Sequence, residues 1–420
     1  MSIESHLERI PDREQITSQT GRAAALAWLA TEAGAALLAE AARLPPDRLT
    51  RLTRLRRQVS PELAAATVEL QELRQRARAK FSDADTMFFT PEGLEQSTGE
   101  AIARYRAARF PEGAAILDAC CGIGGDARAL AARGPVLAVD RDPAAAVCAR
   151  ANAAPSAPLF PLCADMTALD LARLRERGVE AALFDPSRRV DRPGGGRRRA
   201  RSAEAYSPPL SWLEALRAPF PALAVKVSPA LPDEDLTRWG ARVEFLSDQG
   251  ECKEAALWFG PLAEMLPAGD GACATVLRAG APPATLTAFA CAPPALSEPR
   301  AWLYEPDPAV IRAHLIPQVA SLLDAAQLDR QIAYLTADTL VATPFATAYR
   351  VLDWLPFQLK SVQARLRALG RRVTAIKRRG VPLEPETLRK RLTGAEDADA
   401  SAIVVLTRLA DRPIALLCEA

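Results

Sequence analysis

The sequence predicts an α/β protein, in which an open, doubly wound sheet follows a helical domain and precedes an α+β domain. Residues 115–140 carry the first observation, because they fit a strand, a glycine-rich turn, a helix and a second strand. The second observation is that short apolar runs alternate with helical segments up to about residue 260, a pattern typical of parallel strands joined by helices.

Length and composition indicate a globular protein of several domains. The 420 residues are 49% hydrophobic and 25% charged, with a net charge of +2, so any nucleic-acid footprint has to be local. The 8 cysteines form no C-x-x-C pair and are accompanied only by His6 and His314, so we expect no metal site. We find no N-terminal signal and no apolar run of membrane-spanning length, and we therefore expect a cytoplasmic protein without membrane contacts.

The first segment, residues 12–80, is expected to be helical. Pro45 and Pro46 interrupt its Ala/Leu-rich run, and Ser60-Pro61-Glu62 has the form of a capped helix start. The helix that follows ends in a basic stretch, residues 74–80. This stretch would either contact phosphates or form a solvated helix end.

The turn at residues 118–126, D-A-C-C-G-I-G-G-D, lacks the G-x-G-x-x-G spacing of a dinucleotide site. Its glycines let the backbone approach a ligand, and the helix N-terminus presents free N–H groups. Asp118 and Asp126 would repel a pyrophosphate but suit a ligand that carries an ammonium and a sulfonium. Asp140, at the end of the second strand, is placed to bind both hydroxyls of a ribose. The alternative is a strand–helix–strand unit that binds no ligand.

Acids follow four successive expected strands: Asp118, Asp140, Asp165 and Asp185. One such acid could be a turn residue, but four form a pattern, because open α/β sheets bind ligands at the carboxyl ends of their strands. Seven strands are expected in this part of the chain, at residues 114–117, 136–139, 159–163, 181–184, 222–227, 242–246 and 255–259.

Seven arginines crowd the loop beside Asp185: Arg188, Arg189, Arg192, Arg197, Arg198, Arg199 and Arg201. They form either a solvated loop or a surface that binds a phosphate backbone, and their position favours the surface. From about residue 261 the sequence predicts short strands, helices at 308–326 and 357–369, and a tail of strand, basic turn (377–380), helix and final hairpin.

The glycine-rich turn resembles motif I of the class I S-adenosylmethionine-dependent methyltransferases, in the C-G-x-G-G form of trimethylguanosine synthase-like enzymes. The tail resembles the THUMP-like domain at the C-terminus of a bacterial family of such enzymes. The resemblance runs from F-F-T-P-E-G-L-E-Q through D-P-S-R-R to I-K-R-R-G-V. It implies a Rossmann-like class I methyltransferase sheet at 86–260, preceded by an N-terminal helical domain (1–85) and followed by an accessory α+β region (261–350) and an α+β THUMP-like domain (351–420).

The same resemblance implies S-adenosylmethionine as the cofactor. In this class the acid after the third strand bonds the adenine amino group, which places Asp165 there. The T-P-E segment lies near the cofactor, so Gln96 and Thr98 would approach its methionine end unless their helix only packs. The expected cofactor-binding residues are Thr90, Gln96, Thr98, Asp118, Cys120, Gly122, Gly124, Gly125, Asp140, Arg141, Asp165 and Met166.

Amino-methylating enzymes of this class carry [D/N/S]-P-P-[Y/F/W] after the fourth strand, where the first residue orients the target amine and the aromatic stacks on the base. Here Ser187 replaces the second proline and Arg188 the aromatic, which puts a planar base in doubt, although arginine also stacks on bases or pairs with phosphate. The expected catalytic residues are Asp185, Pro186, Ser187 and Arg188. The expected substrate-binding residues are Arg189, Arg197, Arg198, Arg199, Lys226, Lys377, Arg378 and Arg379, and Glu251 or Glu254 would complete the pocket or lie on a surface loop.

The sequence thus favours a methyltransferase that acts on RNA, with an amino group of a base as the favoured acceptor. One alternative is a methyltransferase for a small anionic metabolite or a protein. Another is an RNA-binding protein that keeps the fold without catalysis, and the unbroken run of strand-end acids and glycines speaks against it.

Overall fold

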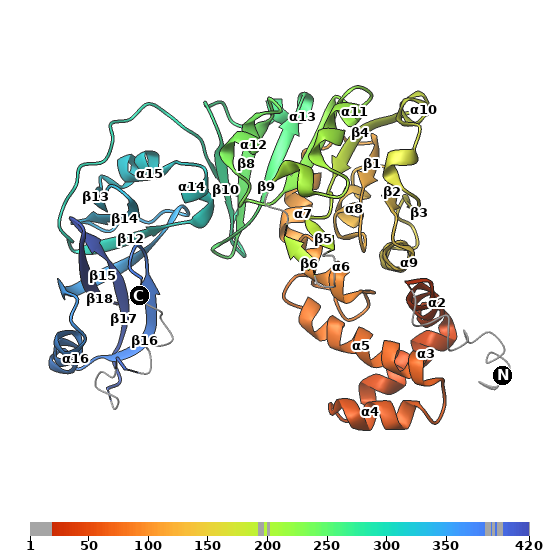
Figure 1. The fold of residues 1–420 in the computed structure, drawn as a ribbon, viewed down its shortest axis with the longest axis horizontal. Helices are drawn as coiled ribbons and strands as arrows, with labels where there is room; N and C mark the ends of the chain where they lie inside the picture. The colour runs from red at the N-terminus through yellow and green to blue at the C-terminus, as the bar shows by residue number, and fades with distance from the viewer. Residues whose placement is uncertain are drawn as a thin grey trace. The chain divides into compact units, whose positions relative to one another are not determined.

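A computed structural model of the protein describes residues 19–191, 197–199, 202–382, 388, 391–392 and 398–419 (Figure 1). The chain divides into two compact units. One unit consists of Met1–Arg242 and Ala255–Leu266, and the other of Val243–Glu254 and Pro267–Ala420. The division into four domains expected from the sequence stays a proposal.

Four helices open the first unit: α2 (Gln19–Leu29), α3 (Glu32–Arg43), α4 (Arg48–Leu55) and α5 (Pro61–Ala77). Thr31, Asp47 and Ser60 begin the last three of them, and each accepts a backbone N–H from the first turn, as N-cap residues do. The apolar core of these helices includes Ala144 and Cys148 of α9 (Pro143–Asn152). The helical segment therefore packs directly on a helix of the sheet layer.

All seven strands expected for the central sheet are present: β1 (Ala115–Ala119), β2 (Val136–Asp140), β3 (Leu159–Cys163), β4 (Val179–Phe184), β7 (Ala222–Val227), β8 (Arg242–Asp248) and β9 (Glu251–Phe259). They are hydrogen-bonded in the order β3-β2-β1-β4-β7-β9-β8, and β10 (Cys273–Leu277) and β11 (Ala284–Leu286) extend the sheet beyond β8. The first five of these seven strands run parallel, and β9 is antiparallel to β7. The α/β prediction is confirmed.

Helices and short turns connect these strands: α6 (Pro91–Gln96) and α7 (Glu100–Ala107) before β1, then α8 (Gly125–Leu130), α9, the 3-10 helix η2 (Met166–Ala168), α10 (Leu171–Glu176), η3 (Ala203–Ala205), η4 (Leu210–Trp212), α11 (Leu213–Arg217), α12 (Asp233–Thr237) and α13 (Pro261–Glu264). The loop with seven arginines at positions 188–201, which we call the arginine loop, contributes a two-stranded ribbon of β5 (Arg189–Asp191) and β6 (Arg197–Arg199). Because parallel strands end at the same edge of a sheet, the residues that follow β1, β2, β4 and β7 gather at one edge.

The second unit contains a seven-stranded sheet in the order β13-β14-β12-β15-β18-β17-β16. Its strands are β12 (Trp302–Pro306), β13 (Ala326–Asp329), β14 (Ile332–Ala337), β15 (Ala346–Pro356), β16 (Arg372–Arg378), β17 (Ser401–Leu409) and β18 (Arg412–Glu419). Strand β15 runs across residue 350, so the accessory and THUMP-like regions expected from the sequence share this sheet.

The helices of this unit are α14 (Pro308–Arg312), α15 (Ile316–Leu323) and α16 (Leu359–Ala368). The sequence predicted a single helix over 308–326. The structure instead breaks it at His314, which has a left-handed backbone with φ of 59°, and ends α15 at Asp324 with φ of 48°. Left-handed residues cannot continue an α-helix, so this part of the prediction was wrong.

Within the described residues, no single helix is long and apolar enough to span a membrane. One pair, Gly21–Leu29 and Glu32–Arg43, reaches that length and composition only together, across a bend of 84°.

Candidate active site

The glycine-rich turn between β1 and α8 adopts left-handed backbone at three positions. Cys120 has φ of 68°, Gly122 of 54° and Gly124 of 81°. A Cβ atom on Gly124 would lie 3.1 Å from the Cα of Ala149 in α9, closer than an ordinary contact, so both packing and φ favour glycine there. A Cβ atom on Gly122 would meet nothing within 4 Å, which leaves open space beside the turn at this position.

Asp140, the last residue of β2, contacts this turn through its carboxylate. One carboxylate oxygen accepts the N–H of Gly122 at 2.9 Å, and the other accepts the N–H of Asp142 at 2.9 Å. Burial raises the pKa of Asp140, and the two backbone hydrogen bonds oppose that rise. The structure thus fixes the acid at the strand end against the glycine-rich turn.

Asp118 is fully buried in β1, and neither of its carboxylate oxygens has a hydrogen-bond partner among the described residues. Burial raises the pKa of Asp118 well above its usual range, and the nearby carboxylates of Asp126 and Asp185 raise it further. Arg106 and Lys226 oppose this rise. An unpaired buried carboxylate is costly, and a positively charged ligand would relieve that cost.

Two ion pairs accompany Asp118. Arg106 of α7, only 1% exposed, pairs with Asp126 of α8, and Lys226 at the end of β7 donates to Asp185 Oδ2 at 2.7 Å. With Asp118 ionised, this group of three carboxylates and two cations carries one net negative charge. No local sequence pattern indicates Arg106, because its ion pair joins residues on different helices.

Lys226 is held by protein atoms. Besides Asp185, its Nζ donates to the carbonyl oxygen of Gln96 at 3.2 Å, at the end of α6. Burial raises the pKa of Asp185, and Lys226 opposes that rise. Lys226 therefore joins the T-P-E helix to the carboxylate that follows β4, and we interpret it as a residue that positions Asp185 rather than one free to bind substrate.

The two threonines expected near the cofactor, Thr90 and Thr98, differ in their hydrogen bonding. Thr90 is buried and caps α6, since its Oγ1 accepts the N–H of Gly93 at 2.9 Å. The Thr98 hydroxyl is buried and has no hydrogen-bond partner in the described part of the chain. Thr98 is thus the more suitable of the two hydroxyls for contact with a ligand.

Residues expected around the adenine and ribose lie at the ends of β2 and β3. Asp165 is exposed and caps η2 by accepting the N–H and the hydroxyl of Thr167, which lower the pKa of Asp165. Met166 is buried and Arg141 is exposed. Burial raises the pKa of the Cys120 thiol.

The D-P-S-R segment after β4 is anchored by a backbone bridge. The N–H groups of Ser187 and Ser207 donate to each other's carbonyl oxygens at 3.0 and 2.9 Å, while Pro186 is buried and Arg188 half-buried. The side chains of Arg189, Arg197, Arg198 and Arg199, and the whole of Arg192 and Arg201, lie outside what the structure describes.

Next to this bridge lies Tyr206, which the sequence pattern did not indicate as a site residue. Tyr206 is 4% exposed, and its hydroxyl oxygen accepts the N–H of Ser228 at 2.9 Å, just after β7. Burial raises the pKa of Tyr206, which also lies within reach of the charges on Arg188 and Asp185. An aromatic side chain therefore lies beside the D-P-S-R segment, although Arg188 replaces the aromatic in the motif itself.

The remaining expected residues belong to the second unit. Lys377 Nζ lies 2.6 Å from Glu305 Oε2, and Arg379 lies 3.8 Å from Glu305 Oε1. The rings of Tyr349 and Tyr334 lie under these two cations, at 5.3 and 5.4 Å. Lys377 and Arg378 form the end of strand β16, so the turn expected at residues 377–380 begins later than the sequence suggested. One carboxylate thus faces two of the three cations at residues 377–379, the stretch that we continue to call the basic turn.

Two acids that were expected near the pocket also lie in this unit. Glu251 is exposed and pairs with Lys253, and Glu254 is buried in β9. Among the described residues, no group of three or more His, Cys, Asp or Glu could hold a metal ion.

Comparison with known proteins assigns the chain to a family. Two Mycobacterium tuberculosis proteins, from strains CDC 1551 and H37Rv, are each named as an uncharacterized S-adenosylmethionine-dependent methyltransferase. Each is 32% identical to this chain over 337 residues, which cover 77% of this chain and 88% of the relative. The chain belongs to this family of S-adenosylmethionine-dependent methyltransferases, and S-adenosylmethionine is its cofactor.

The two ends of the chain match family models. Residues 346–420 match a family described as THUMP domain-like, which confirms the THUMP-like prediction for the tail. Residues 22–77 match a domain of unknown function, DUF8688. A crystal structure from Porphyromonas gingivalis W83, described as a candidate methyltransferase, shares the fold over 98% of this chain and 99% of its own, with a TM-score of 0.72 and 20% identity.

Proposed function

We propose that this methyltransferase acts on RNA and that an amino group of a base is its favoured acceptor. The observation that carries the proposal is the THUMP-like domain at residues 346–420. Such a module beside a methyltransferase core suggests that the tail holds RNA while the core modifies it. The arginine loop beside Asp185 agrees with a substrate that carries phosphates.

We further propose that the cofactor lies along the glycine-rich turn. Asp140 would bind the ribose hydroxyls, Asp165 the adenine amino group, and Asp118 the positively charged methionine end. The unpaired buried carboxylate of Asp118 and the open space beside Gly122 support this placement. When bound, the cofactor supplies an electrophilic methyl group on a sulfonium.

The chain's own residues would mainly align the acceptor, because transfer from a good leaving group needs orientation more than activation. Asp185 accepts an N–H of the acceptor amine and directs its lone pair. The amine loses a proton as it gains the methyl group, and Asp185 would accept that proton. Lys226 keeps the carboxylate in place, and Arg188 contacts the base or a neighbouring phosphate.

The test is transfer of a labelled methyl group from the cofactor to cellular fractions. The protein is incubated with labelled S-adenosylmethionine and either total RNA, protein extract or small metabolites. Label in nuclease-sensitive RNA, recovered as a methylated amino group after digestion, supports the proposal. Label confined to protein or to small molecules contradicts it.

One observation favours a second candidate, a small anionic substrate. Lys377 and Arg379 both face Glu305, which leaves the basic turn less charge for phosphates than the sequence suggests. Arg188, in place of an aromatic, also suits an anionic group close to the acceptor atom. Label recovered only in the metabolite fraction would select this candidate.

A further inference from the structure

The helical segment that matches a domain of unknown function contains an unusually basic stretch. Residues 43–57 include six arginines and one acid, Asp47. Two of the six already have protein partners. Arg48 pairs with Glu72, and Arg51 is buried, with its Nε donating to the carbonyl oxygen of Pro45 at 2.9 Å. The other four are exposed, and no ion pair joins them to a described residue: Arg43, Arg54, Arg56 and Arg57.

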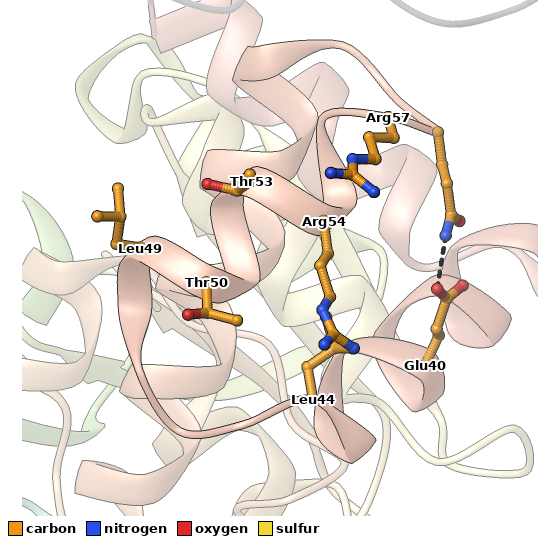
Figure 2. A pocket seen from close by; sticks show the side chains of 8 residues that line it. Glu40, Leu44, Leu49, Thr50, Thr53, Arg54 and Arg57 are labelled. Atoms are coloured by element: carbon orange, nitrogen blue, oxygen red, sulfur yellow. Dashed lines mark hydrogen bonds between the residues drawn. The ribbon is translucent and has the colours of Figure 1, made fainter.

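An open hollow of about 650 Å³ lies against α4, and we call it the α4 hollow. It is lined by Glu40, Leu44, Leu49, Thr50, Thr53, Arg54, Arg57 and Gln58 (Figure 2). The four polar residues that run from Thr50 to Arg57 are spaced at i, i+3, i+4 and i+7. This spacing places Thr50, Thr53 and Arg54 on one face of α4 and Arg57, in the turn after the helix, on the same side.

The local sequence explains why this face stays open. Asp47 caps α4 by accepting the N–H of Thr50 at 2.7 Å, which fixes where the helix begins. Arg51 and Leu55 then form the buried face of α4. The face that carries Thr50, Thr53, Arg54 and Arg57 therefore points away from the core, and exposed Leu49, 71% accessible, lies at its start.

The charge of the α4 hollow is not neutralised by its own lining. Its one carboxylate, Glu40, accepts the side-chain amide of Gln58 at 2.6 Å, and neither Arg54 nor Arg57 forms an ion pair with it. Two guanidinium groups with hydroxyls beside them suit phosphate oxygens, which arginine binds in a planar fork.

We propose that the α4 hollow is a docking site for the phosphate backbone of single-stranded RNA. The inference rests on the proposed function for its choice of RNA over other polyanions. It adds a contact surface on the N-terminal helical segment, and none of the residues that line it belongs to the candidate active site. The exposed Leu49 suits contact with a base between two bound phosphates.

The experiment compares two double variants of the full-length protein that lose the same charge. Arg54→Gln with Arg57→Gln removes the guanidinium groups of the hollow. Arg43→Gln with Arg56→Gln removes two exposed arginines of the same segment that do not line it. Binding of a fluorescently labelled 20-nucleotide polyuridylate is measured by anisotropy against salt, with thermal unfolding to confirm that each variant is folded.

We expect the hollow variant to bind several-fold more weakly than the control variant. Its salt dependence should be shallower by roughly 0.7 log–log units for each lost phosphate contact, about 1.4 for two. Equal losses in both variants would mean diffuse attraction and overturn the proposal, as would unchanged binding in the hollow variant. A polyglutamate peptide that competes better than the RNA would assign the hollow to an acidic protein and also overturn it.

Methylation of RNA by the unmodified protein, measured in parallel, separates this inference from the proposed function. If RNA is methylated and the hollow variant binds polyuridylate normally, only the docking site fails. If the hollow binds RNA but no RNA is methylated, the proposed function fails and the docking site stands.

Discussion

Asp118 is expected to favour cofactor binding and, in the absence of cofactor, to lower the stability of the folded protein. The folded protein raises the pKa of Asp118 well above the value of about 3.9 expected in the unfolded chain. The folded state therefore holds this proton more tightly than the unfolded state does. As a result, the free energy of unfolding falls as pH rises from about 4 through the folded pKa.

Asp118→Asn removes this pH dependence, because an amide does not ionise. Without cofactor and at neutral pH, the variant should be more stable, because the folded protein no longer holds a buried carboxylate that lacks a hydrogen-bond partner. It should also bind S-adenosylmethionine more weakly, because the carboxylate no longer meets the positive methionine end. Thermal unfolding across pH and calorimetry measure the two effects.

Asp165→Asn is the matched control, because Thr167 lowers the pKa of Asp165. A lowered pKa contributes stability above the unfolded value, and this contribution is lost as pH falls through the folded pKa. Asp165→Asn should therefore not increase stability. A destabilised Asp118→Asn protein with unchanged cofactor affinity would contradict our interpretation of Asp118.

Asp185 should be essential for transfer and dispensable for cofactor binding. Asp185→Ala should abolish methylation, because the acceptor amine loses the group that orients it, while calorimetry should find nearly unchanged cofactor affinity. Asp185→Asn keeps the shape and can still accept an N–H from Lys226. It therefore serves as the control for the loss of the Lys226 partner in the alanine variant. Normal turnover by the alanine variant would mean that another group orients the acceptor.

Lys226 should act through Asp185. Burial raises the pKa of Asp185, the charge of Asp126 raises it further, and Lys226 and Arg106 oppose the rise. Lys226→Met removes the main opposing charge, so the acid limb of the single-turnover rate should move to higher pH. Lys226→Arg keeps the charge and should restore the original limb. An unshifted limb in Lys226→Met would rule out this positioning role.

At the scale of elements, apolar runs and strand-end acids predicted the strands well. The run 222–227 coincides with β7, because a strand buried in a parallel sheet is a nearly continuous apolar run. The run 159–163 likewise coincides with β3, although β3 is an edge strand and only Leu159 in it is buried. The antiparallel pairing of β9, the burial of Arg106 and the position of Tyr206 depend on contacts between distant residues. No local pattern encodes such contacts, and the left-handed His314 likewise carries no sequence signal.

The glycine-rich turn permits a test that separates backbone strain from packing. Gly124→Ala must accept both a left-handed φ and a contact with Ala149, whereas Gly122→Ala accepts only the φ. A left-handed backbone costs about 1–2 kcal/mol for a residue with a Cβ. Gly122→Ala should therefore lose about that much stability in urea unfolding, and Gly124→Ala should lose more.

For cofactor affinity we expect the opposite order, with the larger loss in Gly122→Ala and the smaller one in Gly124→Ala. The space beside Gly122 is open, so a methyl group there would meet the bound cofactor, and Gly122→Ala should lower cofactor affinity more than its loss of stability accounts for. Equal cofactor affinity in Gly122→Ala and in the unmodified protein would place the cofactor elsewhere.

At the scale of the whole molecule, most of the methyltransferase sheet belongs to one compact unit, whereas Val243–Glu254 of β8 and β9, the strands β10 and β11, and the THUMP-like sheet belong to the other. If the tail holds RNA and the core modifies it, substitutions in the two units should affect different steps. Neutralising Lys377, Arg378 and Arg379 to Gln should weaken RNA binding and lower its salt dependence by roughly one log–log unit per lost phosphate contact. Cofactor affinity should not change.

A substitution of Glu305 serves as the control for the predicted loss of RNA binding at Lys377, Arg378 and Arg379. The Glu305 carboxylate faces Lys377 and Arg379, and it competes with phosphates for them. Glu305→Gln keeps the shape, frees both cations and should strengthen RNA binding, most clearly at low salt where screening is weak. Binding isotherms against salt for both variants and the unmodified protein provide the measurement. Weaker binding in Glu305→Gln, or none in any variant, would mean that the basic turn serves the fold of the second unit and not RNA.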